Sequence, residues 1–177
     1  MKKIILLVAL LTSLSVGIYA QIVRTIVGAT RYDLQTNRSI QRRVVVEPNS
    51  GKVSICYTGS LDPDAGSGAF VSRGTGYYYF NGTGVPAALD TFLGRQESWR
   101  VGWPNLLYLA GGKEAIITHI SDGGFNGLHM IKRNTIGSGS WTEGGITNGT
   151  ETWPRAANSG DSIIVISTLY TGGTLPN

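Results

Sequence analysis

The side chains best suited to bind a ligand lie beside two Trp-Pro dipeptides. Arg100 comes shortly before Trp103, and Arg155 comes shortly after Trp153. An indole ring can stack on a sugar, and a guanidinium group donates several hydrogen bonds to carboxylate or hydroxyl oxygens. Arg100, Trp103, Trp153 and Arg155 are therefore our candidate ligand-binding residues, at one rim of the fold. Repetition at equivalent places favours a packing role for both tryptophans instead, because burying one indole removes roughly 150–250 Å² from water.

Other reactive side chains give weaker signals. His119 and His129 are expected on neighbouring strands and could face each other, but no third metal ligand is evident. Asp62 and Asp64 offer fewer oxygen ligands than a calcium loop needs. Cys56 is expected to be a small buried residue rather than a nucleophile. The sequence therefore predicts no metal site and no cofactor, and it assigns no catalytic residue.

The elements that must position the two tryptophans recur along the chain. Residues 103–118 and 153–167 each read as a strand, a tight glycine turn and a second strand, and a fainter copy spans residues 44–57. Trp103 and Trp153 are 50 residues apart. A period of roughly 20–50 residues indicates a propeller, a solenoid or an array of repeats.

Short antiparallel strands are expected over most of the chain. We predict an opening strand within residues 22–29, a hairpin over 40–57, a strand over 73–80 closed by Asn81-Gly82, and an outer strand within 90–100. Four strands are expected between residues 106 and 142, which is the number in one propeller blade. Two more are expected from residue 151 to about residue 168.

These strands predict an all-β fold. Its expected architecture is a set of antiparallel four-stranded blades of an incomplete β-propeller, about two and a half blades over residues 21–177. A closed propeller needs at least about four blades, so the chain is expected to be the N-terminal piece of a longer protein. The alternative is a small β-sandwich that uses all of the strands.

The first 20 residues are expected to be a secretory signal peptide. Lys2 and Lys3 precede an apolar run that ends at Ala20, and Gln21 begins a more polar sequence. Cleavage is expected between Ala20 and Gln21. The alternative is an uncleaved anchor, because the apolar run of 17 residues is at the short limit for a membrane span. We expect an exported chain, secreted or at the cell surface, with no transmembrane segment after cleavage.

Composition argues against a nucleic-acid partner. The formal net charge is +4, and without Lys2 and Lys3 the chain keeps 13 basic and 11 acidic groups, a balance of +2. The basic residues are scattered, whereas a nucleic-acid-binding protein normally carries a basic stripe. The 25 glycines fall singly or in pairs between apolar runs, which is typical of a β protein rich in turns.

Several segments resemble the repeat openings of secreted bacterial β-propeller proteins, a type that often carries a C-terminal sorting domain. The matching segments are residues 30–37 (TRYDLQTN), 73–77 (RGTGY), 102–104 (GWP) and 152–157 (TWPRAA). The resemblance covers most of residues 26–170. It implies a propeller fold in an exported protein of a Gram-negative bacterium, and it implies no particular activity.

The same repeats are distantly similar to the blades of sialidases. In that family three arginines hold the sugar carboxylate, a Tyr–Glu pair supplies the nucleophile and an Asp is the acid. The family's Arg-Ile-Pro motif is missing here. Asp122-Gly123-Gly124 keeps only part of its Asp-box turn, because Ile120 stands where a hydroxyl side chain is needed. No residue of this chain is assigned a catalytic role from the similarity.

The predicted function is that of a secreted, non-catalytic β-propeller module that binds a glycan or a protein through its blade loops. One alternative is the N-terminal part of a sialidase-like glycoside hydrolase whose catalytic residues lie in other blades. Another is a structural or adhesive surface protein.

Overall fold

Three antiparallel sheets make up the part of the chain that the computed structural model describes, which is residues 24–32, 34–35, 41–48, 50–63, 70–122, 125–147 and 149–169. Sheet 1 contains β1 (Val44–Val46), β2 (Val53–Gly59) and β3 (Gly74–Phe80). Sheet 2 contains β4 (Val101–Leu109), β5 (Lys113–Asp122), β6 (Phe125–Arg133) and β7 (Thr142–Gly145). Sheet 3 contains β8 (Glu151–Ser159) and β9 (Ser162–Leu169).

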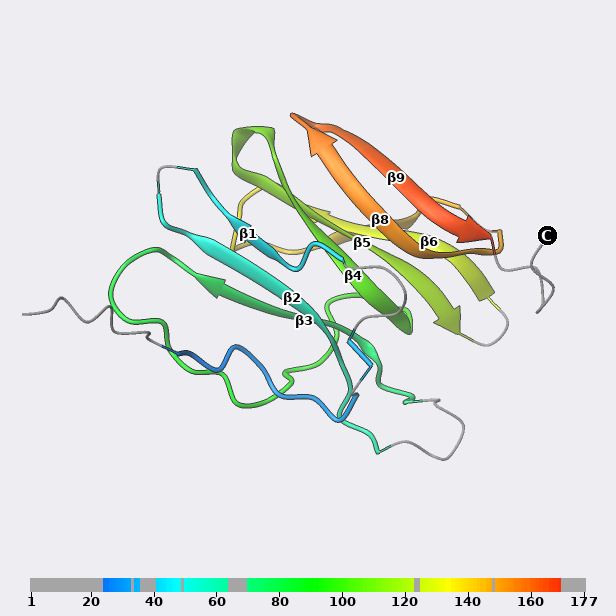
Figure 1. Ribbon diagram of the computed structural model, residues 1–177, viewed down its shortest axis with the longest axis horizontal. Helices are drawn as coiled ribbons and strands as arrows, with labels where there is room; N and C mark the ends of the chain where they lie inside the picture. Colours follow the sequence, from blue (N-terminus) through cyan, green and yellow to red (C-terminus); the bar gives the residue numbers. More distant parts are fainter. Residues whose placement is uncertain are drawn as a thin grey trace, which may run out of the picture.

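In each sheet the strands follow one another in chain order, as hairpins dictate (Figure 1). Val45 of β1 lies opposite Ser54 of β2, and Gly51 in the turn between them has a φ of 69°, which glycine adopts without strain. A 3-10 turn (Ala110–Gly112) joins β4 to β5. The predicted hairpin over residues 40–57, the strand over 73–80, the first three strands of the 106–142 unit and the final two strands are confirmed, whereas its fourth strand runs later than expected, over Thr142–Gly145.

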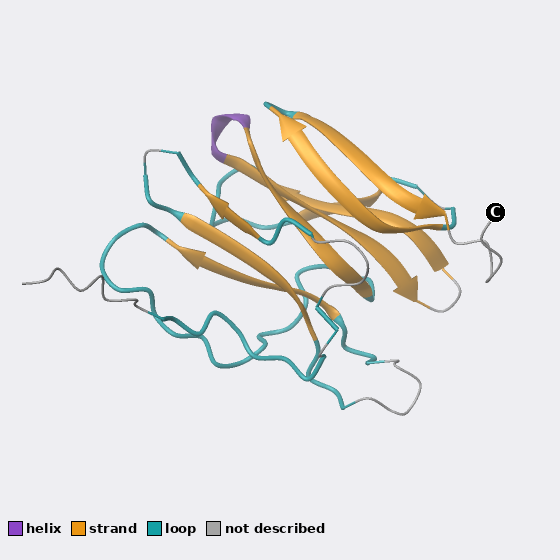
Figure 2. Cartoon of the chain, viewed as in Figure 1, coloured by secondary structure: helices purple, strands orange, loops and turns teal. Residues whose placement is uncertain are grey.

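Two expected strands are absent from the residues that the structure describes. Residues 24–30 and 90–100 are irregular, as the loops of Figure 2 show. The chain just before the second segment binds the first, since the Leu89 N–H donates to the Ile26 carbonyl (2.7 Å). Further along, the Gln96 N–H reaches the Thr75 carbonyl of β3 (3.2 Å), but Glu97 then turns its carboxylate onto the Thr75 N–H (2.7 Å). A side chain therefore takes the place of the next backbone pair, and no fourth strand forms on sheet 1.

Sheet 2 lies between the other two sheets (Figure 1). Successive side chains of a strand point to opposite faces, so each of its inner strands supplies two cores. The core toward sheet 1 consists of Val45, Cys56, Leu106, Ile116 and Ile131, with Tyr77, Tyr108 and Trp141 at its edge. The core toward sheet 3 consists of Leu107, Leu109, Ala115 and Ile117, packed against Met130, Ala156, Ile163 and Val165.

The all-β, antiparallel fold class is confirmed. None of the three sheets closes on itself, and a stack of open sheets is compatible with propeller blades and with sandwich packing alike. The expected signal peptide and its cleavage site at Ala20 and Gln21 lie outside the described residues. Within the described residues, no helix has the length and apolar character to cross a membrane.

Candidate functional site

Both Trp-Pro dipeptides occupy the same local structure. The pairing of β4 with β5 shifts between Gly102 and Asn105, and that of β8 with β9 shifts between Thr152 and Arg155. Inside these bulges Trp103 and Trp153 have positive φ angles of 55° and 47°. A non-glycine residue in this region costs on the order of 1–3 kcal/mol, and a bulge re-aims the side chain that it carries. The sequence repeat is therefore a structural repeat, with a bulge and a positive φ at the tryptophan as its shared features.

The two indoles meet in an aromatic cluster, which we call the tryptophan cluster. It contains Tyr32, Phe70, Trp103 and Trp153. Ring centres are 5.0 Å apart for Tyr32 and Phe70, 6.1 Å for Tyr32 and Trp103, and 6.5 Å for the two indoles, all in edge-to-face geometry. Trp103 is 6% exposed and Trp153 is half-buried. Residues from four separate stretches of chain thus form one aromatic core at the Trp-Pro ends of β4 and β8.

His119 of β5 packs into the same cluster. Its ring lies parallel to the Trp103 indole, with centres 4.7 Å apart, and its Nδ1 accepts a hydrogen bond from the Trp153 backbone N–H (2.9 Å). Burial, together with the charges of Arg73 and Arg100, lowers the pKa of His119 to about 3. The imidazole is therefore neutral at physiological pH and holds the β8 bulge in place.

Two arginines border the cluster. The Arg73 guanidinium carbon lies 5.4 Å from the centre of the Tyr32 ring and 5.1 Å from that of Trp103, and its Nε donates to the Val101 carbonyl (3.0 Å). Arg100 donates from Nε to the Phe70 carbonyl (3.2 Å). Arg73 is 4% exposed, and burial, with the nearby Arg100, lowers its pKa to about 10. Cation–π contact with two rings stabilises this buried charge.

The structure thus brings together three of the four predicted ligand-binding residues. Arg100, Trp103 and Trp153 meet at the cluster, whereas Arg155 is exposed on β8 opposite Ile166. Trp103 has little free ring surface, which favours the packing interpretation over sugar stacking for this residue. A ligand-binding role for these residues stays a prediction. Arg73 was missed, because nothing in its sequence neighbourhood marks an arginine that a distant strand buries.

The two histidines lie on opposite faces of sheet 2, so the idea that they face each other was wrong. His119 points toward sheet 3, where it binds β8, while His129 pairs with Thr118 and points toward sheet 1. His129 Nε2 lies 3.0 Å from a Glu143 carboxylate oxygen. Nowhere in the described ranges do three or more His, Cys, Asp or Glu side chains gather in a way that could hold a metal ion.

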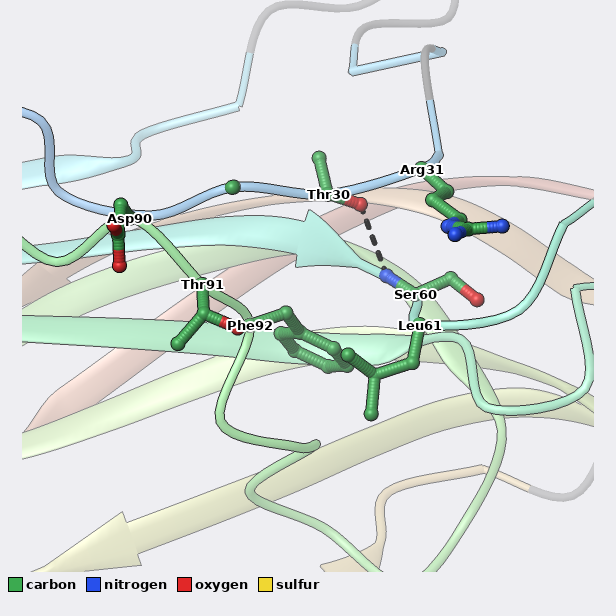
Figure 3. Close-up of a pocket in the computed structure, with 8 residues that line it drawn as sticks. Thr30, Arg31, Ser60, Leu61, Asp90, Thr91 and Phe92 are labelled. Atoms are coloured by element: carbon green, nitrogen blue, oxygen red, sulfur yellow. Dashed lines mark hydrogen bonds between the residues drawn. The ribbon is translucent and has the colours of Figure 1, made fainter.

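A hollow of about 220 Å³ opens beside the end of β2 (Figure 3). Arg31 in its wall directly precedes Tyr32 of the tryptophan cluster in the sequence. Three loop segments meet there, and the Ser60 N–H donates to Thr30 Oγ1 (2.9 Å). The hollow combines a buried ring with exposed charged groups and hydroxyls. Its lining residues are Ala29, Thr30, Arg31, Ser60, Leu61, Asp90, Thr91 and Phe92.

A second hollow of about 400 Å³ shares Leu61 and Phe92 with the first. Asp62 and Arg95 bring charge to its wall, and Val71, Ser72 and Gly94 complete its lining. Hydrogen bonds from the hydroxyl and backbone N–H of Ser72 lower the pKa of Asp62. The Asp62 carboxylate is therefore fixed and ionised at neutral pH. The two hollows adjoin at Leu61 and Phe92, and we call them together the loop groove.

No sequence signal marks the loop groove, because its residues come from loops with no shared spacing. No known protein family matches the chain, and no curated protein matches it. The binding role proposed below therefore rests on the geometry and chemistry of the loop groove.

Proposed function

We propose that the chain is a secreted, non-catalytic module, part of a β-propeller, that binds a glycan or a protein through the loop groove. The propeller is supported by the pairing register of sheets 2 and 3. The binding role is supported by the groove itself. Secretion rests on the leader expected over residues 1–20.

Matched positions in sheets 2 and 3 support the propeller. Counted along the pairings from the two Trp-Pro bulges, Ala115 corresponds to Ile164 and Ile117 corresponds to Ile166. Ile117 is 0% exposed beneath sheet 3, whereas Ile164 and Ile166 are 67% and 72% exposed. A further sheet packed on sheet 3 as sheet 3 packs on sheet 2 would cover both isoleucines. Such a repeating stack is the arrangement of consecutive propeller blades.

The make-up of the loop groove carries the binding role. Arg31 and Asp90 are exposed on its rim and can each form paired hydrogen bonds with neighbouring hydroxyls. Thr30 and Thr91 add hydroxyl groups, and Phe92 gives an apolar floor. Polar groups of fixed direction over an apolar surface are typical of small-ligand sites. Because the two hollows adjoin, the groove is suited to an oligosaccharide rather than to one small molecule.

Binding of the exported protein to a glycan array tests this function. The protein is taken from the culture medium, and N-terminal sequencing that starts at Gln21 would confirm its export. Arg31→Ala and Asp90→Asn are expected to weaken glycan binding about tenfold or more, since each removes hydrogen bonds made by a charged group. Lys132→Ala, an exposed residue on β6, serves as the matched control and should bind as the parent does.

Each result has a defined consequence. Glycan binding that the two groove variants leave unchanged would refute the groove as the site. Hydrolysis of the bound glycan would favour the glycoside hydrolase. Absence of binding to glycans and to surface proteins would favour a structural or adhesive role.

A further inference from the structure

Three buried N–H donors in the tryptophan cluster have no hydrogen-bond partner. They are Arg73 Nη2, Trp103 Nε1 and Trp153 Nε1. A buried polar group without a partner costs roughly 1–3 kcal/mol, and more when the group is charged. Such groups are uncommon in folded proteins and call for an explanation. Three unpaired N–H donors at one aromatic cluster indicate a binding site for a hydrogen-bond acceptor.

The cluster also contains a positive charge without a counter-charge. Within the described ranges no carboxylate forms an ion pair with Arg73, and burial and the like charge of Arg100 lower its pKa more than its hydrogen bond with Tyr32 raises it. Arg100 has a carboxylate nearby: its backbone N–H binds Asp122 Oδ2 (3.3 Å), and that carboxylate partly offsets the burial that lowers the pKa of Arg100. His119 is neutral. Among the residues that the structure describes, the Arg73 guanidinium is therefore the positive charge at the cluster without an ion-pair partner.

The balance of charge decides which class of ligand fits. One anionic charge would neutralise Arg73 and supply oxygen atoms to the indole N–H groups. A divalent anion would leave a surplus negative charge in an apolar site, and the cost of desolvating an ion is already several kcal/mol. A planar guanidinium also matches a carboxylate in a two-point geometry. The half-buried Trp153 is the member of the cluster that connects it to solvent.

We propose that the tryptophan cluster is a binding site for a monocarboxylate, held by the Arg73 guanidinium and by the indole N–H groups of Trp103 and Trp153. The site is separate from the loop groove and does not depend on glycan binding there. Groove variants such as Arg31→Ala should leave it intact, so the two proposals fail independently.

Titration of the mature chain with sodium acetate, at constant ionic strength, tests the site. Indole fluorescence should change in a saturable way, because two of the four tryptophans donate to the ligand. The midpoint of thermal unfolding should rise with acetate concentration, since a ligand that binds only the folded state stabilises it. Sodium sulfate and sodium chloride at the same ionic strength should give neither a saturable signal nor an equal rise.

Conservative variants identify the donors. Trp103→Phe and Trp153→Phe keep an aromatic ring and remove the N–H, so each should weaken acetate binding about tenfold or more. Trp141→Phe is the matched control, because its indole N–H binds Gln96 outside the cluster (3.0 Å), and its acetate affinity should equal that of the parent. Arg73→Gln should abolish saturable binding. If this variant does not fold, the tryptophan variants still decide the question.

Three results would overturn the proposal. The first is acetate affinity that is unchanged in both Trp103→Phe and Trp153→Phe. The second is saturation by sulfate or chloride at the concentrations that saturate with acetate, which would indicate a general anion site. The third is an equal loss of acetate affinity in Trp141→Phe, which would indicate a global effect on the fold.

Discussion

Sheet 2 is covered on both faces, and its two contacts are built from different side chains. Toward sheet 3 the contact is mainly aliphatic, with Leu107 and Ile117 at its centre. Toward sheet 1 an aliphatic core is joined by a buried ion pair between Glu114 and Arg133. Because the two faces alternate along the same strands, the difference comes from side-chain choice at alternate positions and not from the backbone.

The polar face has the stricter geometry. Glu114 accepts hydrogen bonds from the Tyr77 hydroxyl (2.9 Å), the Gly137 N–H (2.9 Å) and Arg133. The Arg133 guanidinium carbon lies 4.5 Å from the centre of the Tyr77 ring and 4.1 Å from that of Trp141. Aliphatic packing tolerates small shifts, whereas this network works only in one register of sheet 1 against sheet 2. The polar contact therefore fixes how sheet 1 is placed against sheet 2, whereas the aliphatic contact mainly stabilises the fold.

Removing the carboxylate of the polar face should have the largest effect. Glu114→Ala leaves the Arg133 charge buried and unpaired, and we expect it to lower the free energy of unfolding by about 3–5 kcal/mol. Urea denaturation measures the loss. Replacing both members, as Glu114→Met with Arg133→Met, should restore most of the stability, because no unpaired charge remains.

A surface pair gives the control for this experiment. Lys113 and Asp161 form an ion pair between the hairpin turns of sheets 2 and 3, and both are partly exposed. Asp161→Ala should cost less than about 1 kcal/mol. A loss at Asp161 that matches the loss at Glu114 would remove the distinction between the two faces.

The aliphatic face should show the next largest effect, at matched positions. Ile117→Ala is expected to cost about 2–5 kcal/mol, because it opens a cavity between sheets 2 and 3. Ile166→Ala, at the corresponding place on the exposed face of sheet 3, should change the stability of the 177-residue chain by no more than about 0.5 kcal/mol. Thermal unfolding of the two variants measures both. An equal loss at both positions would show that sheet 3 is covered in solution.

The third comparison concerns pH, and the effect has opposite signs on the two faces. On the sheet 1 face, burial raises the pKa of Glu97 from 4.5 to about 7, so stability falls as pH rises through that range. On the sheet 3 face the pKa of His119 is lowered from 6.5 to about 3, so stability rises with pH between those values. From about pH 4.5 to 6.5 the two contributions oppose each other.

Glu97→Gln removes the contribution of Glu97 to the pH dependence of stability. Relative to the parent, the free energy of unfolding of this variant should rise with pH between about 4.5 and 7, by at most about 1.4 kcal/mol per pH unit. Urea denaturation at several pH values gives the difference between the two proteins, in which the groups that they share cancel. A difference that is flat with pH would show that the Glu97 carboxyl titrates normally in the folded chain.

The sequence predicted the elements of sheets 2 and 3 well, because their signals are local. Alternating apolar residues, glycine turns and the repeated Trp-Pro dipeptide are all visible within a few positions. The outer strand expected over residues 90–100 was wrong, since a distant contact of Glu97 with Thr75 replaces it. Whether the stack belongs to a propeller stays a prediction, as does the export of the chain.

The candidate sites could be predicted only in part. The repeat pointed to Trp103 and Trp153, and the bulges bring both into one cluster. Arg73 and Tyr32 were not foreseen, because their roles depend on which strands become neighbours. The loop groove was invisible for the same reason, since three loops without any shared pattern form it.

The buried thiol of Cys56 can report how often sheets 1 and 2 separate. Cys56 is the single cysteine of the chain and lies between sheets 1 and 2, with Sγ 3.7 Å from the Pro104 carbonyl oxygen. Burial raises its pKa to about 12, so almost none of it is in the reactive thiolate form at neutral pH. An alkylating reagent can modify this thiol only when the two sheets separate. The rate of modification therefore reports how often that contact opens, without any change to the sequence.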